Sequence, residues 1–149
     1  LRADLSPTFR KCPMYDAADL ERIAREEVPY VGQLGLKVES VGSGEVTVRL
    51  PFRADMIRHG GTISGPVMMG VADYTLYALV LTRRPDAMQS VTTNLTANFL
   101  RRPKPDDLMF HGKLLKIGRR LAVGEVTTYS IGDDEPVCHI TGTYAISAG

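Results

Sequence analysis

The sequence predicts an α+β fold in which one antiparallel sheet wraps around a single long helix. Residues 63–82 are almost entirely apolar, and Asp73 is their only charged side chain. A hairpin-like pattern precedes this segment, and four strand-like segments follow it. A helix that is apolar nearly all round must be covered on most sides. A curved sheet would cover most of it, and a second subunit could cover the remainder.

The length of 149 residues suits one domain, which we expect to span residues 15–149 behind a loosely held arm, residues 1–14. Asp16 is a suitable N-cap for a short amphipathic helix at the start of this domain. Residues 34–41 and 45–50 then alternate between apolar and polar side chains on either side of a glycine-rich turn. This pattern predicts a β-hairpin.

The long helix is expected to begin at Pro66, with Ser64 or Gly65 as its cap, after a loop over residues 51–65. Proline is favoured at the first position of a helix because its missing N–H is not needed there. Arg83 would lie in the last turn, where a cation interacts favourably with the helix dipole.

Four strands are expected after the helix, joined by short turns as an antiparallel meander. In the last of them, alternation places Tyr144 on the apolar face. The four segments are residues 90–101, 107–117, 121–131 and 136–147.

Composition and residue spacing exclude several classes of function. The net charge is +1 and no basic, aromatic-interleaved stripe occurs, so neither nucleic acid nor an anionic membrane is an expected partner. Cys12 and Cys138 lie far apart, as is typical of a reduced, cytoplasmic protein rather than a disulfide scaffold. The first residues also lack the apolar core of a signal peptide. The three histidines form no pair with metal-ligand spacing, so no metal site is expected.

Two motifs carry a family resemblance. Residues 64–73 (SGPVMMGVAD) open the long helix, and residues 90–103 (SVTTNLTANFLRRP) form the strand after it. They resemble PaaI-like acyl-CoA thioesterases of phenylacetate catabolism, in which His-Gly-Gly opens the helix, Leu-Ala-Asp follows, and a strand ends in Phe-Leu-Arg-Pro. The resemblance covers about residues 30–147 and implies the hotdog fold, a sheet wrapped round one helix.

The chain departs from the family pattern at the start of the helix. It has Ser64-Gly65-Pro66 where the family has His-Gly-Gly, and its own His59-Gly60-Gly61 lies five residues earlier. The glycine at position 65 and the acidic residue at position 73 are retained.

Thioester hydrolysis needs a donor for the developing oxyanion and a base or nucleophile for the carbonyl carbon. The Gly65 amide at the helix N-terminus can be the donor, and Asp73 can activate water or attack directly. The resemblance also implies that Thr92 orients the water. Gly65 and Asp73 are eight residues apart, about 12 Å along one helix, so one chain cannot bring both to one carbonyl group. We therefore expect a homodimer with two shared sites, or a dimer of such dimers.

The expected substrate is an acyl-CoA, and no cofactor is required because coenzyme A is part of the substrate. Ser64 and His59 would lie at the mouth of the site, and Met68 or Met69 would line the acyl pocket. Cations at strand ends could bind the phosphates of coenzyme A. These cations are Arg101, Arg102, Lys104, Arg119 and Arg120.

Three alternatives remain open at this point. Asp73 could be a structural carboxylate bonded to a neighbouring strand or to Tyr144. His59 lies fourteen residues before Asp73, a spacing similar to that of hotdog acyl-carrier-protein dehydratases, although the Phe-Pro-Gly that follows their histidine is missing here. The chain could also be a non-catalytic acyl-CoA-binding module, although residues 1–30 are too short and too weakly basic for the DNA-binding segment that sensors of this fold carry.

Overall fold

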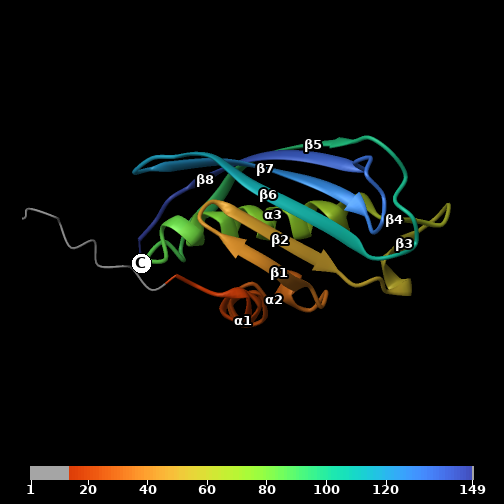
Figure 1. Ribbon diagram of the computed structural model, residues 1–149, viewed down its shortest axis with the longest axis horizontal. Coiled ribbons are helices and arrows are strands. Elements are labelled where there is room, and N and C mark those ends of the chain that lie inside the picture. Colours follow the sequence, from red (N-terminus) through yellow and green to blue (C-terminus); the bar gives the residue numbers. More distant parts are fainter. Residues whose placement is uncertain (1–13, 149) are drawn as a thin grey trace, which may run out of the picture.

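The computed structural model describes residues 14–148, and the expected arm, residues 1–14, lies outside this range except for Met14. A six-stranded antiparallel sheet curves around one long helix, α3, in the order β1-β2-β6-β7-β8-β5 (Figure 1). The elements are α1 (Ala17–Glu27), α2 (Pro29–Gly32), β1 (Lys37–Gly42), β2 (Glu45–Leu50), the 3-10 helix η1 (Ala54–Met56), β3 (Ile57–Arg58), β4 (Thr62–Ile63), α3 (Gly65–Arg83), β5 (Val91–Phe99), β6 (Leu108–Ile117), β7 (Leu121–Ser130) and β8 (Cys138–Ala145).

Helix α3 lies in the core because its side chains are apolar on nearly every side. Ser64 is its N-cap and Pro66 lies in its first turn, as the sequence predicted. It packs closely on the sheet because β7 and β8 carry glycines beneath it. A Cβ atom on Gly124 or Gly142 would lie only 2.9 or 2.5 Å from the side chain of Leu76. The glycines therefore let the helix approach the sheet backbone, and the apolar surface between helix and sheet is removed from water.

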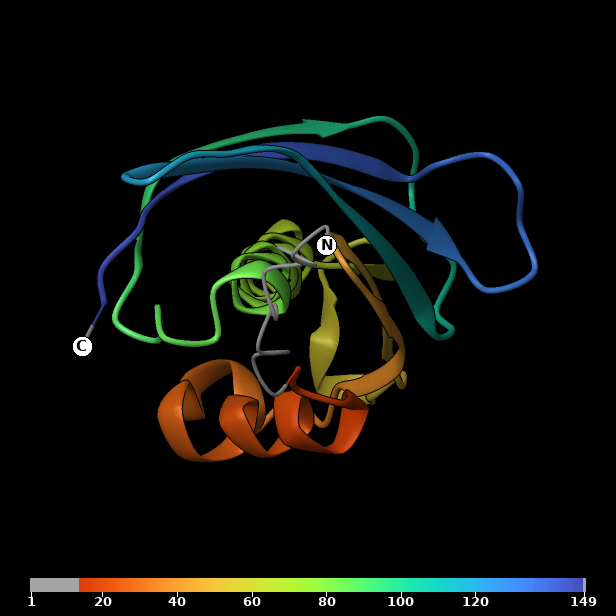
Figure 2. The ribbon, with the colours of Figure 1, turned by 60° about the vertical axis from the view of Figure 1, so that its left-hand side comes forward.

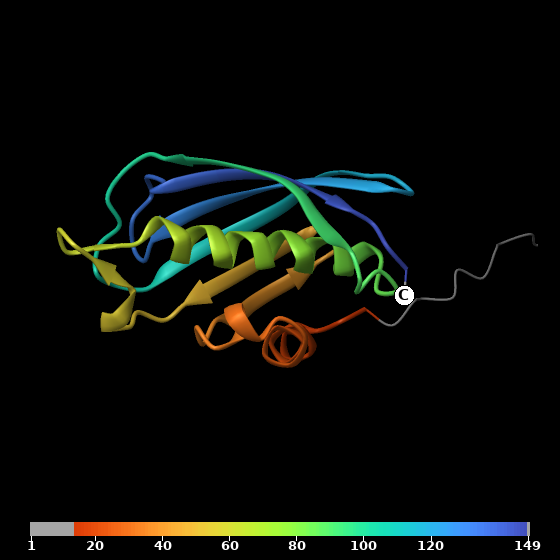
Figure 3. The same cartoon turned by 180° about the vertical axis from the view of Figure 1, so that it is seen from behind.

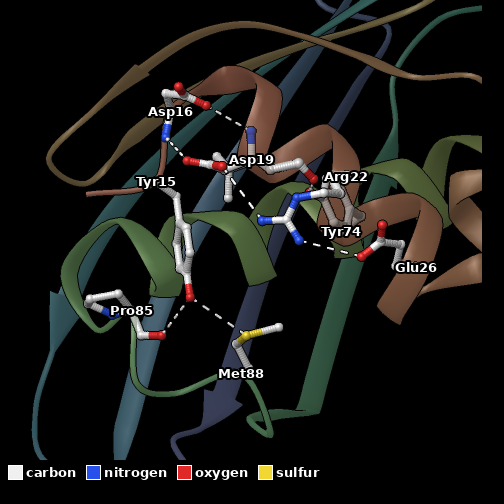
Figure 4. Close-up of polar contacts among 9 residues, drawn as sticks. Tyr15, Asp16, Asp19, Arg22, Glu26, Tyr74, Pro85 and Met88 are labelled. Carbon is white, nitrogen blue, oxygen red and sulfur yellow. Dashed lines mark hydrogen bonds and ion pairs between the residues drawn. The ribbon is translucent and has the colours of Figure 1, made fainter. Parts of the chain in front are cut away.

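Helix α1 covers α3 on the side away from the sheet (Figure 2). It begins at the predicted N-cap, where the Asp16 and Asp19 side chains each accept a bond from the other's backbone N–H. The Tyr74 hydroxyl donates to the Leu20 carbonyl, and Tyr15 reaches the Pro85 carbonyl at 3.1 Å (Figure 4). These contacts join α1 to the middle and the C-terminal end of α3.

The expected four-strand meander is wrong in one respect, the position of β5. Strands β6, β7 and β8 do form a meander, but β5 pairs with β8 at the edge of the sheet. Strand β6 instead pairs with β2, on the edge of β2 that does not pair with β1. The segment from Leu100 to Asp107 runs around the end of the sheet (Figure 1), and a connection of this length can cross the intervening strands.

Three local features were not predicted from the sequence. Helix α2 follows α1, β1 begins only at Lys37, and the expected loop over residues 51–65 contains a small β3–β4 ribbon. Gly60 and Gly61 turn this ribbon with φ values of 96° and 75°, a left-handed region that favours glycine. His59-Gly60-Gly61 is therefore a turn and does not open the helix. Within residues 14–148, no helix combines the length and hydrophobicity needed to cross a membrane.

Candidate active site

Asp73 lies midway along α3 with one carboxylate oxygen held by two hydroxyl groups. Its Oδ1 accepts hydrogen bonds from Thr92 Oγ1 at 2.8 Å and from the Tyr144 hydroxyl at 2.6 Å. The Tyr144 oxygen also lies 2.9 Å from the Asp73 carbonyl oxygen. No residue of the described part of the chain donates to Oδ2. The half-buried carboxylate is thus fixed through Oδ1, and its Oδ2 has no donor among the described residues.

The two donors reach Asp73 because they face each other across β5 and β8. Thr92 is the register partner of Tyr144, and a bulge between Thr92 and Asn94 follows directly. Tyr144 is only 4% exposed, on the inward face that its alternation predicted. Burial and the neighbouring Asp73 carboxylate raise the pKa of Tyr144, so its hydroxyl stays a donor well into the alkaline range.

The bond from Tyr144 is the one expected if Asp73 were purely structural, so it does not by itself decide the role of the carboxylate. The surroundings of Asp73 are more informative. It lines a cavity of about 310 Å³. The walls come from the α1–α2 junction, the middle of α3 and the starts and ends of two strands, and they include Val28, Val31, Tyr77, Met88 and Thr92. A purely structural carboxylate does not need such a cavity beside it.

Gly65 lies at the N-terminus of α3 in a second, larger cavity of about 970 Å³. Ser64 makes no side-chain capping bond, and no partner for the Gly65 amide occurs among the described residues. A Cβ atom at position 65 would lie 3.3 Å from the Phe99 ring, so glycine leaves room beside the amide. The amide is therefore a free donor at the positive end of the helix dipole.

The Gly65 cavity gathers most of the predicted binding residues. Ser64, His59, Arg101 and Arg102 all line it. Met68 from α3, one of the two methionines expected at the acyl pocket, also lines it, and so does Arg58 from β3, which was not a predicted binding residue. Arg58 reaches the cavity from the short ribbon, which was not predicted.

The remaining predicted residues lie elsewhere. Met69 is half-buried in the first turns of α3 and does not line the Gly65 cavity, which its neighbour Met68 lines. Arg119 and Arg120 lie on the β6–β7 turn, beside the end of β8, where the Ile146 amide donates to the Arg120 carbonyl at 2.8 Å. Neither arginine lines the Gly65 cavity or the Asp73 cavity.

The two cavities share no residue, so the sequence-predicted oxyanion donor and base are separate within one chain. His59 is likewise apart from Asp73, since it lines only the Gly65 cavity. Two other kinds of reactive group, a cysteine thiolate and a bound metal, are not supported by the described residues. Burial raises the pKa of the Cys138 thiol to about 11, which leaves little thiolate at neutral pH. Residues 14–148 contain no cluster of three His, Cys, Asp or Glu side chains suited to a metal.

This fold and site define a class of protein, and sequence comparison identifies it. Residues 60–137 match the thioesterase superfamily, and the chain belongs to that superfamily, with the hotdog fold. It is a thioester hydrolase.

Solved structures resemble this chain over most of its length. A "putative thioesterase" from Silicibacter sp. TM1040 is 37% identical, with a TM-score of 0.79 over 89% of this chain and 92% of that one. A variant of the phenylacetic acid degradation protein PaaI from Thermus thermophilus is 27% identical, with a TM-score of 0.71 over 80% and 99%. A hypothetical thioesterase from Streptococcus pneumoniae TIGR4, solved with coenzyme A, shares the fold at 21% identity and a TM-score of 0.69 over 76% and 86%.

Proposed function

We propose that this chain is a cytoplasmic, PaaI-like acyl-CoA thioesterase that needs no cofactor and hydrolyses its substrate at a site shared by two subunits. The observation that carries the proposal is the carboxylate of Asp73. Thr92 and Tyr144 hold its Oδ1, no described residue donates to its Oδ2, and Asp73 lines a cavity. A carboxylate with one oxygen fixed and the other available is arranged to act on a water molecule.

In the proposed reaction, Asp73 Oδ2 takes a proton from water as the oxygen of that water attacks the thioester carbonyl carbon. The carbonyl π electrons move onto the oxygen, and the Gly65 amide stabilises the resulting oxyanion. The oxyanion then collapses, the carbon–sulfur bond breaks, and coenzyme A leaves as a thiolate with the electron pair. This thiolate takes up the proton held by Asp73, which restores the carboxylate. The products are the free acid and the coenzyme A thiol.

The site becomes complete only if a second copy supplies Gly65. Helix α3 has an open stripe over Pro66, Met69, Gly70 and Asp73, all of them exposed or half-buried. No strand or helix lies in front of the N-terminal half of α3 in the view of Figure 3. A Cβ atom on Gly70 would contact nothing within 4 Å, so another helix could approach closely there.

Strand β5 offers the matching edge for this second copy. Its outer edge pairs with no described strand, and Val91 and Phe99 are 59% and 50% exposed. Unpaired strand edges are ready to pair with another chain. Antiparallel pairing of two β5 strands would set two α3 helices side by side in opposite directions. Each Asp73 would then face the first turn of the other helix.

Coenzyme A would bind on the Gly65 side of the shared site. Arg58, Arg101 and Arg102 give that cavity three cations, which suit phosphate groups. The same fold holds coenzyme A in the Streptococcus pneumoniae protein. The isolated cysteines, Cys12 and Cys138, favour a reducing, cytoplasmic location.

The decisive experiment measures thiol release from short, long and aromatic acyl-CoAs by the wild type and by Asp73→Asn. Asparagine can still accept both hydroxyl bonds, so the fold and the dimer should persist while turnover falls about 100- to 10,000-fold. Asp134→Asn, at an exposed turn, is the matched control and should keep full activity. Unchanged turnover in Asp73→Asn would refute the proposed base.

The hydratase alternative needs a second assay, the addition of water to an enoyl thioester, because hydration releases no thiol. His59 lines the Gly65 cavity, so it would meet Asp73 only across two subunits. If the chain hydrates an enoyl thioester and His59→Ala abolishes this, the hydratase is favoured. If the chain binds acyl-CoAs tightly but releases no thiol from any of them, it is a binding module.

A further inference from the structure

The Asp73 cavity differs from the Gly65 cavity in its charge. Two carboxylates line it, Asp73 and Glu27, and no lysine or arginine of the described residues does so. Glu27 is the last residue of α1, and it is exposed at the wall formed by Val28 and Val31. This cavity is therefore anionic where the Gly65 cavity is cationic, and phosphate groups are repelled from it.

The Glu27 carboxylate also acts on Tyr77, an aromatic residue that lines the same cavity. Burial raises the pKa of Tyr77, and the Glu27 carboxylate adds to this effect. The neighbouring Glu26 differs, since it lies 3.4 Å from Arg22 and does not line the cavity. No ion pair of Glu27 occurs among residues 14–148.

The cavity also has few free hydrogen-bond donors. Three tyrosine hydroxyls border it, and each already donates to the protein. Tyr74 donates to the Leu20 carbonyl, Tyr77 to the Met88 carbonyl at 2.7 Å, and Tyr144 to Asp73. The Thr92 hydroxyl is also bonded to Asp73, so among the described side chains that line the cavity only Ser90 keeps a free hydroxyl hydrogen. A polar end group on a ligand would lose its water and gain almost nothing in return.

We infer that Glu27 is a specificity-determining residue, which makes the Asp73 cavity accept uncharged, apolar acyl groups and disfavour acyl groups that end in a carboxylate. This inference rests on the proposed thioesterase function. A volume of about 310 Å³ corresponds to roughly ten water-sized groups, so a short or medium acyl chain would bring its far end close to the α1–α2 wall. A terminal carboxylate there would face Glu27 without a counter-cation.

The test compares two acyl-CoAs with chains of six carbons, one ending in methyl and the other in a carboxylate. The wild type should prefer the methyl-ended substrate in kcat/KM. Glu27→Gln should raise kcat/KM for the carboxylate-ended substrate about two- to fivefold, the range of partly exposed charge interactions, with little change for the other. Glu27→Lys should shift the ratio further in the same direction. Both variants should fold, since a negative charge at a helix C-terminus is unfavourable.

Two controls separate a local effect from a general one. Glu26→Gln removes the same charge from the adjacent residue and should leave the substrate ratio unchanged. Raising the ionic strength should narrow the ratio of the wild type, because exposed charges are screened over about 10 Å, while coenzyme A contacts cancel between the two substrates.

The outcomes distinguish this inference from the proposed function. If the wild type hydrolyses neither substrate and no other acyl-CoA, the proposed function fails. If it hydrolyses the methyl-ended substrate but neither Glu27 variant moves the ratio, the function stands and the role of Glu27 is overturned. A wild-type preference for the carboxylate-ended substrate, or an equal shift in Glu26→Gln, would also overturn it.

Discussion

The first turn and the middle of α3 belong to one rigid element, but they have opposite chemical character. The first turn carries a free backbone amide beside a wide cavity lined by cations. The middle carries a carboxylate with two hydroxyl donors beside a narrow, anionic cavity. Each half lacks what the other has. The difference teaches that one helix can supply both halves of a reaction only if two copies meet.

Of the variants that follow, Gly65→Pro is expected to have the largest effect, because it removes the amide and keeps a backbone conformation that the start of the helix accepts. Proline is favoured at a first helical position, and Ser64, with φ −67° and ψ 146°, already has the conformation preferred before proline. Loss of one oxyanion donor should lower kcat about 100- to 1,000-fold.

Gly65→Ala is the matched control, since it adds the same Cβ atom toward Phe99 but keeps the amide. It should retain most of the turnover if the donor matters. Equal losses in both variants would show that space near Phe99, and not the N–H group, is required.

Mixing two inactive variants tests whether the first turn of one subunit and the middle of α3 in another form one site. Dimers that combine one Asp73→Asn chain with one Gly65→Pro chain contain one intact site, so an equal mixture should recover about a quarter of the wild-type activity. The measurement is thiol release after the two inactive variants are unfolded and refolded together. No recovery in confirmed mixed dimers would mean that the site is not shared.

Tyr144→Phe tests the hydrogen bond to Asp73 in the middle of α3. It removes one donor from Asp73 Oδ1 and keeps the ring, so we expect kcat to fall about tenfold, with KM nearly unchanged, for a charge-assisted hydrogen bond. A purely structural tyrosine would lower thermal stability without lowering the kcat of the folded protein.

The smallest effect is expected for Arg102→Gln at the cationic end. Arg102 has no ion pair among residues 14–148, whereas Arg101 is paired with Glu135 at 2.5 Å. Arg102→Gln should therefore raise KM about two- to fivefold without changing kcat, and Arg101→Gln should have less effect. Steady-state kinetics at low and moderate salt would check this. An equal or larger effect at Arg101 would contradict it.

Local patterns in the sequence predicted several features that the structure confirms. The capping residue Asp16, the inward alternation of β2 and β8, and the start of α3 at Gly65 and Pro66 all depend on residues close together in the chain. The edge position of β5 could not be read in this way, because short-range turn signals do not say which strand fills the free edge of β2.

The candidate site was predictable only in its separate parts. Asp73 was recognisable as an isolated charge in an apolar helix, and Gly65 as the residue at its N-terminus. The contribution of the α1–α2 junction had no sequence signal, since Glu27 and Val31 meet Asp73 across more than 40 residues. Arg58 lines the other cavity from β3, a strand of two residues that is too short to show periodicity.

The sequence by itself determined that one apolar helix would carry a single carboxylate and that strands would surround it, because helix and strand periodicity are local properties of the chain. Only the tertiary structure decided which hydroxyls hold that carboxylate, which strand lies at the free edge, and which charges line each cavity. These depend on contacts such as Tyr144 with Asp73, 71 residues apart. Such contacts arise from the packing of whole elements, which no local pattern specifies.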